Sequence, residues 1–261
     1  MRKIRALIIV VLSAALSAFF PGCVTDTASL KIEKSLPQNK LAYYNDPFDK
    51  FRSDLWDKAG LIYNEAQEAN FKLAKMVIEN GKLKVETKTG CFSKGGLGFK
   101  YGLRGNFDIQ VECHIDFLKG VYDMDQMLGF LVMERGKAVG AADFVYLRLL
   151  KKGGNDSGTI FSASLVNGRY HSGNEREINN FDGTLRIVRK GSNITTLYKT
   201  KGTNKWEDLG TFWSTSNDLG IGVLLQNFTM RRRSITAKSP VTATFDNFRI
   251  NAAEEIIEED I

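Results

Sequence analysis

Apolar and polar side chains alternate strictly along Gly105–Phe117. From position 107 the odd-numbered residues are Phe, Ile, Val, Cys, Ile and Phe, whereas the even-numbered residues from 108 to 116 are Asp, Gln, Glu, His and Asp. A period of two places successive side chains on opposite faces of an extended chain. The segment is therefore predicted to be a β-strand whose odd face, including Cys113, lies in the core. Its even face is left for solvent or a ligand.

The same alternation recurs in short segments along most of the chain. Residues 75–78 and 82–87 flank Asn80-Gly81, a pair suited to the positive φ angles of a hairpin turn. The alternating segment 97–101 is expected to turn through residues 102–105 directly into the long strand. Residues 65–75 have the one helical period and are expected to form a short helix. Further strands are expected over 127–134, 143–150, 159–166, 184–191, 194–200, 219–225 and 241–250. The pattern predicts an all-β domain.

The N-terminus has the pattern of an export signal. An apolar run from Ala6 to Phe20 follows a short basic head and is shorter than the ~20 residues that span a bilayer, so residues 1–22 are predicted to be a signal peptide. Cys23 resembles the lipid-bearing cysteine of the bacterial lipoprotein lipobox. That resemblance implies an exported protein anchored by its lipid to the cell envelope, and in a Gram-negative cell to the outer membrane. The alternative is an ordinary cleaved signal with an incidental cysteine.

Composition divides the rest of the chain into three parts. Residues 23–44 are polar without a sustained period and are expected to form a lipidated N-terminus and flexible linker. Residues 45–251 fit one domain, and residues 252–261 form an acidic tail. The net charge is +6, and the tail holds five acidic residues, so the domain itself is basic. A basic surface suits anionic polysaccharide or lipid headgroups. No basic helix or stacking platform favours a nucleic acid partner.

The order of the segments resembles a known superfamily. Residues 183–212 read as strand, tight turn, strand, loop and Trp206, followed by "LGIGVLLQNF" and the closing "ATFDNFRI". With the openings "NDPFDKFRSDLWDKAG" and "IENGKLKVET", this progression resembles the concanavalin A-like lectin/glucanase superfamily. The resemblance implies a two-sheet antiparallel jelly-roll β-sandwich over residues 45–251, whose closing strand runs back near the start of the domain. It also implies a concave outer face across which sugars lie.

Carbohydrate recognition needs aromatic rings for sugar C–H faces and planar polar groups for hydroxyls. The Trp and Tyr side chains of the chain could contact the C–H faces of sugars. A Trp in a β-sandwich is more often part of the core, and Trp206 is interpreted as a structural residue. The predicted ligand-binding residues are the polar row and three residues of later segments: Glu112, His114, Asp116, Tyr146, Arg148 and His171. The expected partner is a polysaccharide or oligosaccharide.

Hydrolysis by the superfamily's best-known route requires residues that this chain lacks. Glucanases of this fold carry a Glu-x-Asp-x-x-Glu strand, whereas Glu112-Cys-His-Ile-Asp116 has His in the middle and no final Glu. A non-catalytic carbohydrate-binding module is therefore the leading hypothesis. Relatives that cleave 3-keto disaccharides share a "GxFDIxVE" strand, which makes a glycan-processing enzyme using Glu112 and His114 the alternative. A structural scaffold of the envelope is the third hypothesis.

Metal and redox chemistry receive little support. With two histidines a His-rich site is not expected, and Asp123, Asp125 and Glu134 match no calcium loop, so neither a metal nor a cofactor is predicted. The predicted hairpin pairing places Cys91 about 13 Å from Cys113, beyond the ~7 Å that a disulfide bridges. A bulge at Gly95-Gly96 would shorten the gap. A buried free Cys113 is preferred, with the disulfide as the alternative.

Overall fold

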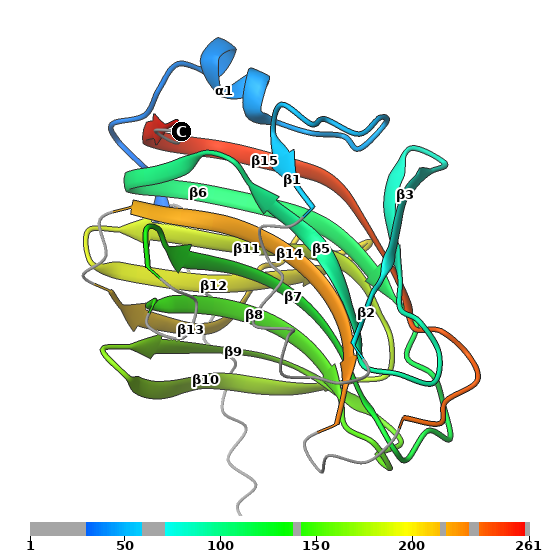
Figure 1. The fold of residues 1–261 in the computed structure, drawn as a ribbon. Coiled ribbons are helices and arrows are strands. Elements are labelled where there is room, and N and C mark those ends of the chain that lie inside the picture. Colours follow the sequence, from blue (N-terminus) through cyan, green and yellow to red (C-terminus); the bar gives the residue numbers. More distant parts are fainter. Residues whose placement is uncertain (1–29, 59–70, 138–141, 215–217, 230–234, 259–261) are drawn as a thin grey trace, which may run out of the picture.

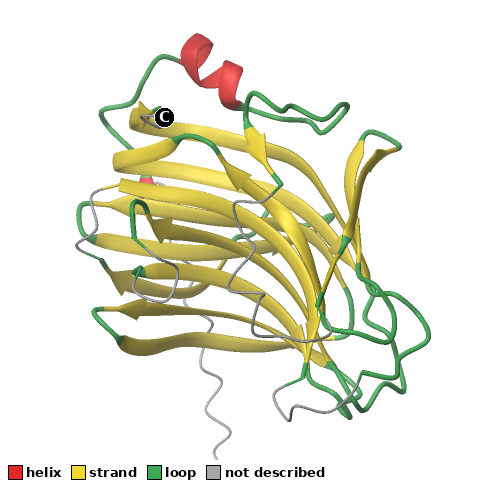
Figure 2. Cartoon of the chain, in the orientation of Figure 1, coloured by secondary structure: helices red, strands yellow, loops and turns green. Residues whose placement is uncertain are grey.

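The computed structural model describes residues 30–58, 71–137, 142–214, 218–229 and 235–258 (Figure 1). Within these residues almost every element is a β-strand, and the only helix is the short α1 (Gln38–Tyr44) (Figure 2). Two antiparallel sheets pack face to face, which confirms the predicted all-β jelly-roll sandwich. The predicted signal peptide and Cys23 lie outside the described residues.

The first layer, here called the β7 sheet, has the order β10–β9–β8–β7–β14–β5, and the short β1 and β2 pair with β5. Its strands are β1 (Trp56–Asp57), β2 (Lys72–Leu73), β5 (Ser93–Phe99), β7 (Asp125–Glu134), β8 (Phe144–Lys151), β9 (Gly158–Val166), β10 (Arg169–Ile178) and β14 (Asp218–Phe228).

The second layer, here called the β6 sheet, has the order β3–β4–β15–β6–β11–β12–β13. Its strands are β3 (Lys75–Glu79), β4 (Lys82–Glu86), β6 (Gly102–Ile115), β11 (Phe181–Lys190), β12 (Asn193–Thr200), β13 (Glu207–Trp213) and β15 (Thr242–Ile257). The layers meet where the start of β14 also pairs with the start of β6.

The core lies between the two sheets and is built by the alternating faces of their strands. The odd-numbered side chains of β6, from Phe107 to Ile115, are all buried, and Cys113 is among them. From the opposite layer, β7 and β8 contribute Leu128, Phe130 and Leu147 to the same cluster. Because each strand hides one face in this cluster, the prediction for the odd face of Gly105–Phe117 is confirmed.

The turns between strands confirm one prediction and correct another. Asn80 and Gly81 have φ angles of 53° and 69° and join β3 to β4, as expected. In contrast, β5 does not pair with β6 as a hairpin: β5 pairs with β14, and β6 pairs with β15 and β11. The short connection between them moves the chain from one layer to the other. The alternation of apolar and polar residues is the same whether β5 and β6 pair or lie in different layers, so it could not distinguish the two arrangements.

The two buried cysteines are both free. The disulfide alternative is therefore wrong, and the preferred interpretation of Cys113 as a small core residue is confirmed. Burial raises the pKa of the Cys113 thiol far above its ordinary range. However, the predicted distance of Cys91 from Cys113 assumed that β5 and β6 form a hairpin, and that assumption is wrong.

Both predicted boundaries of the domain need correction. The expected linker packs on the sandwich from residue 30 onward: Ile32 and Leu41 are buried, and the Leu36 amide donates to the Ala253 carbonyl at 2.7 Å. At the other end, the predicted acidic tail continues β15 as far as Ile257. Apolar residues spaced too sparsely to show a period hold these segments in place.

Two further comparisons concern helices and closure. The helix predicted over 65–75 is wrong for the part that the structure describes. Residues 71–75 contain β2 and the first residue of β3. The closing strand does run back to the start of the domain, because Phe248 forms a β-bridge with Asp46. None of the helical residues described forms a segment long and apolar enough to cross a membrane.

Candidate functional site

The predicted ligand-binding residues occupy three separate places. Glu112, His114 and Asp116 belong to the outer face of the β6 sheet or its edge, and Tyr146 and Arg148 lie on the outer face of the β7 sheet. His171 lies on the edge strand β10. The outer faces point to opposite sides of the sandwich, so these residues do not form one site.

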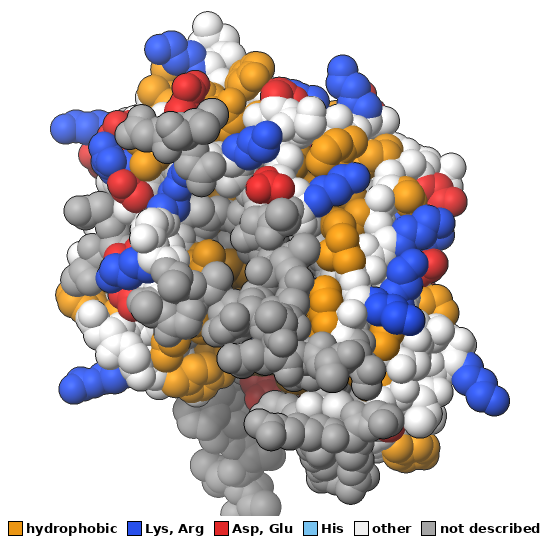
Figure 3. Space-filling view, in the orientation of Figure 1, with side chains coloured by type: hydrophobic (Ala, Val, Ile, Leu, Met, Phe, Trp, Pro, Cys, Tyr) orange, Lys and Arg blue, Asp and Glu red, His pale blue; other side chains and the backbone are white. Residues whose placement is uncertain are grey.

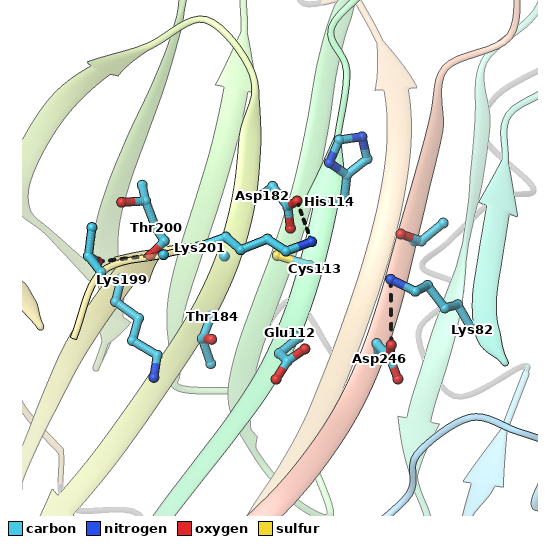
Figure 4. A pocket seen from close by; sticks show the side chains of 14 residues that line it. Lys82, Glu112, Cys113, His114, Asp182, Thr184, Lys199, Thr200, Lys201 and Asp246 are labelled. Atoms are coloured by element: carbon cyan, nitrogen blue, oxygen red, sulfur yellow. Dashed lines mark hydrogen bonds and ion pairs between the residues drawn. The ribbon is translucent and has the colours of Figure 1, made fainter. Parts of the chain in front are cut away.

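A hollow of about 320 Å³ lies over β6, β11 and β12 on the β6 sheet (Figure 4). Glu112 and His114 line it. The Asn247 amide donates to Glu112 at 3.2 Å, and His114 Nε2 lies 3.2 Å from the Asp116 carboxylate. Four further charged residues at this hollow are paired, Lys201 with Asp182 at 3.1 Å and Lys82 with Asp246 at 3.6 Å. The hollow is polar, and these pairs neutralise part of its charge.

The rest of this face is structural. Asp108, the first polar residue of the row, is buried and accepts two hydrogen bonds from the Arg186 guanidinium, at 2.8 and 2.6 Å. That guanidinium lies 5.1 Å from the Trp206 ring centroid. Trp206 packs with Ile32 and two β-sheet residues in a small apolar cluster, which confirms its structural interpretation. The polar row is thus buried at one end, at Asp108, and open from Glu112 to Asp116.

The outer face of the β7 sheet is dominated by apolar and aromatic side chains. The strand register places Arg148 between Gly129 and Phe161. One step along, Tyr146 lies between Leu131 and Ala163. We call the following set the aromatic–arginine platform: Phe144, Tyr146, Arg148, Phe161 and Tyr170.

The side chains of the platform contact one another closely. The Arg148 guanidinium carbon lies 3.6 Å from the centroid of the Tyr146 ring. Phe144 stacks on that ring at 5.4 Å, and Phe161 meets it edge-on at 6.1 Å. The Tyr146 and Tyr170 hydroxyls share a hydrogen bond of 3.0 Å. Tyr146 is 3% exposed whereas Tyr170 is 58% exposed, so the platform extends from a buried base to an open rim.

Burial sets the electrostatics of this platform. It raises the pKa of the Tyr146 phenol and lowers the pKa of the Arg148 guanidinium, which is held among groups that hydrate it poorly. Within the described part of the chain, Arg148 has no ion pair or hydrogen bond, and its titratable neighbours are the two tyrosines, whose phenols are neutral at pH 7. No cluster of three or more potential metal ligands occurs among the described residues.

A shallower hollow of about 180 Å³ adjoins the platform over β5, β14 and β7. Leu131 and Met133 form part of its floor, and they are the cross-strand partners of Tyr146 and Phe144. Lys100, Arg135 and Lys137 are among its lining residues. Figure 3 shows this side of the molecule, where hydrophobic side chains reach the surface among Lys and Arg side chains.

His171 lines a third hollow, of about 720 Å³, where the edge strands β10 and β13 approach each other. Arg169 and Trp213 also line it, and Trp213 is 56% exposed. This hollow lies at the sheet edges, and neither Glu112 nor Arg148 contributes to it.

Sequence reasoning missed two members of the platform, Phe144 and Phe161. Both lie in strands that are apolar on both faces: β8 alternates Phe144 and Tyr146 with the core residues Val145 and Leu147. Large apolar residues on the second face of a strand indicate that this face is also covered or binds something. That signal was present in the segment 143–150.

No protein-family model matches the sequence, and no curated protein matches it. Solved structures do match the fold, β-glucanases among them. A LamA variant of Zobellia galactanivorans in complex with laminaritriose and laminaritetraose is 11% identical, with a TM-score of 0.55, covering 84% of this chain and 99% of that one.

Two other matching structures differ in kind. A pseudo β-1,3-glucanase and immunostimulatory antigen of Mycobacterium tuberculosis is 8% identical, with a TM-score of 0.57, covering 83% of this chain and 98% of that one. The CBM2 module of the evolved Dit of Lactobacillus casei BL23 phage J-1 is 11% identical, with a TM-score of 0.53, covering 80% and 95%. These likenesses show the fold, a jelly-roll β-sandwich.

Proposed function

We propose that this protein binds carbohydrate, without cleaving it, on the outer face of the β7 sheet. The observation that carries the proposal is the aromatic–arginine platform. Its rings suit the C–H faces of sugars, and the Tyr170 hydroxyl and Arg148 guanidinium suit their polar groups. The platform lies across neighbouring strands of one sheet, so a chain of several sugar units has room to contact it.

The residues beside the platform favour binding over hydrolysis. Most glycoside hydrolases use two carboxyl groups that flank the scissile bond. The outward positions on either side of the platform carry no Asp or Glu over the following described ranges: 127–133 of β7, 144–150 of β8, 159–165 of β9 and 220–226 of β14. A sugar on this platform therefore meets no pair of acids from these strands.

The structural neighbours support a carbohydrate ligand for this fold. The LamA variant was solved with laminarin oligosaccharides, and the mycobacterial neighbour is named a pseudo-glucanase. The same fold thus occurs in a protein that binds sugars and in a protein that is named a pseudo-glucanase. A binding role for this chain agrees with both.

The test is a glycan array followed by calorimetry on the glycans that bind. Phe161→Ala should weaken binding by about 3- to 10-fold, the range for one lost aromatic contact. The matched control is Trp213→Ala, which removes an exposed aromatic from the sheet edge and should leave affinity unchanged. Binding of no glycan would reject the proposal and favour an envelope scaffold. Loss with Trp213→Ala alone would move the site to the edge hollow.

A second candidate function is a glycan-processing enzyme on the β6 sheet. Glu112, Asp182 and Asp246 surround one hollow with His114, and Glu112 and Asp246 are cross-strand partners. Paired acids beside a histidine suit general acid–base catalysis. Turnover of a 3-keto disaccharide that is lost in both Glu112→Gln and His114→Ala would support this function. Unchanged turnover in both variants would remove these residues from the mechanism.

We also propose that the domain is exported and held at the cell envelope by a lipid on Cys23. The basic head, the apolar run and the cysteine after Gly22 support this proposal. An anchored binding domain would keep its polysaccharide close to the cell surface.

A further inference from the structure

We propose that the carbohydrate recognised by the platform is acidic, and that Arg148 binds its carboxylate or sulfate group. This inference rests on the proposed binding function and narrows its ligand class. It follows from three features of Arg148: the lack of a counter-charge among the described residues, the stacked geometry and the glycine opposite the side chain.

Arg148 differs from the paired arginines of the chain in lacking an acidic partner. Arg186 is held by Asp108 at 2.6 Å, and Arg104 is held by Asp218 at 2.7 Å. Among the described residues nothing forms an ion pair or hydrogen bond with Arg148, although its side chain is partly buried. Withdrawing a charge from water without a partner is unfavourable. An anionic ligand would supply the missing partner.

The stacked geometry leaves the guanidinium ready to receive an anion. A ring on one face of the guanidinium engages its π surface, whereas the N–H groups lie in the plane and point outward from its edge. Phe144 and Phe161 pack against the same Tyr146 ring and hold it in place. A carboxylate or sulfate accepts two parallel N–H bonds from such an edge. Because the Arg148 side chain is already held against the Tyr146 ring, binding an anion would cost little further side-chain entropy.

The residue across the sheet from Arg148 is small, and the Leu224 side chain lies beside it. This residue on β7 is Gly129, which has no side chain, and a Cβ there would first meet Leu224 at 3.4 Å. The adjoining hollow is lined by Lys100, Arg135 and Lys137 against the two acids Asp57 and Glu134. Lys137 is paired with Glu134 at 2.9 Å, so this lining carries an excess of one basic group beside the platform. Long-range attraction from this excess charge would raise the rate of association with an anionic chain.

The experiment compares one sugar backbone with and without its charge. Calorimetry would measure binding of tetragalacturonate, its fully methyl-esterified form, a sulfated galactan tetrasaccharide and neutral laminaritetraose. The first and third arms distinguish a carboxylate ligand from a sulfate ligand. The variants are Arg148→Gln, Arg148→Lys and, as a control for net charge, Arg249→Gln on the opposite sheet, where the side chain is exposed.

The expected result is binding of at least one acidic saccharide that falls about 10- to 100-fold in Arg148→Gln and stays unchanged in Arg249→Gln. Arg148→Lys keeps the charge but loses the planar fork, so it should show an intermediate loss. A melting curve checks that each variant folds, and an acidic saccharide should raise the melting temperature of the wild type more than that of Arg148→Gln.

Three results would overturn the inference. Equal affinity for tetragalacturonate and its methyl ester, or for acidic and neutral saccharides generally, would show a neutral-sugar platform and leave the proposed function intact. Equal affinity of wild type and Arg148→Gln for an acidic saccharide would place the anion elsewhere. Binding of none of the four saccharides, nor of any array glycan, would reject the inference together with the proposed function.

Discussion

Replacing Asp108 by Asn should lower the free energy of unfolding by about 2–4 kcal/mol, because it leaves a buried arginine without a counter-charge. The Asp108 and Arg186 side chains are only 10% and 13% exposed. Two hydrogen bonds join them, and Asn251 donates a third to the same carboxylate at 3.1 Å. Breaking such a buried pair costs about 3–5 kcal/mol, and the amide oxygen of Asn retains part of the hydrogen bonding.

The same face provides a matched control. Asp182 and Lys201 are also an ion pair across neighbouring strands, but their side chains are 48% and 74% exposed. An exposed pair contributes about 0.2–1 kcal/mol. Asp182→Asn should therefore cost less than about 1 kcal/mol, although it makes the same chemical change in the same sheet.

Urea unfolding followed by tryptophan fluorescence measures both variants, and thermal unfolding gives a second reading. For a domain of this size 1 kcal/mol corresponds to about 2–4 °C, so Asp108→Asn should melt roughly 5–15 °C below the wild type. Adding Arg186→Met should recover much of the loss, since it removes the orphaned charge. Equal losses in Asp108→Asn and Asp182→Asn would refute the assignment of Asp108 to a buried structural cluster.

Three further predictions concern other parts of the chain. Burial raises the pKa of the Asp46 carboxyl above its ordinary 3.8. The folded state therefore binds the carboxyl proton more tightly than the unfolded state does. The free energy of unfolding should fall as the pH rises from about 4 through the raised pKa. Asp46→Asn keeps an acceptor for Trp56 Nε1, and its urea midpoint should not show this fall between pH 3 and 7. If the midpoints of wild type and variant changed in parallel with pH, the prediction would be wrong. Gly81→Ala should cost about 1 kcal/mol through its φ of 69° alone, since nothing lies within 4 Å of the added methyl; an unchanged urea midpoint would oppose this. A palmitate analogue should label the protein in cells but not its Cys23→Ser variant, and equal labelling would exclude that cysteine as the lipid site.

The strands that could be predicted are those with one apolar face and a clear turn. Gly105–Phe117 showed the period of two, and Asn80-Gly81 showed the turn chemistry, and both predictions are confirmed. Strand β10, "RYHSGNEREI", was missed because nearly all of its residues are exposed at the edge of the sheet. An edge strand is held by backbone hydrogen bonds to one neighbour, and these leave no pattern of apolar side chains.

The candidate site was predicted in fragments. Tyr146 and Arg148 were identified as ligand-binding residues, but they were grouped with Glu112, His114 and Asp116, which belong to the other sheet. Alternation shows that a strand has two faces. It does not show which sheet the strand joins, so the alternation of β6 and β8 could not separate Glu112 from Arg148.

By itself, then, the sequence determined the all-β class, the core face of β6 and the hairpin at Asn80-Gly81. These follow from side-chain period and turn chemistry, which act over a few residues. Only the tertiary structure decided that Asp108 is buried against Arg186, and that Arg148 lies on an aromatic platform with no acidic partner among the residues that the structure describes. The physical reason is that burial and charge pairing depend on neighbours from other strands, brought together by sheet order and register.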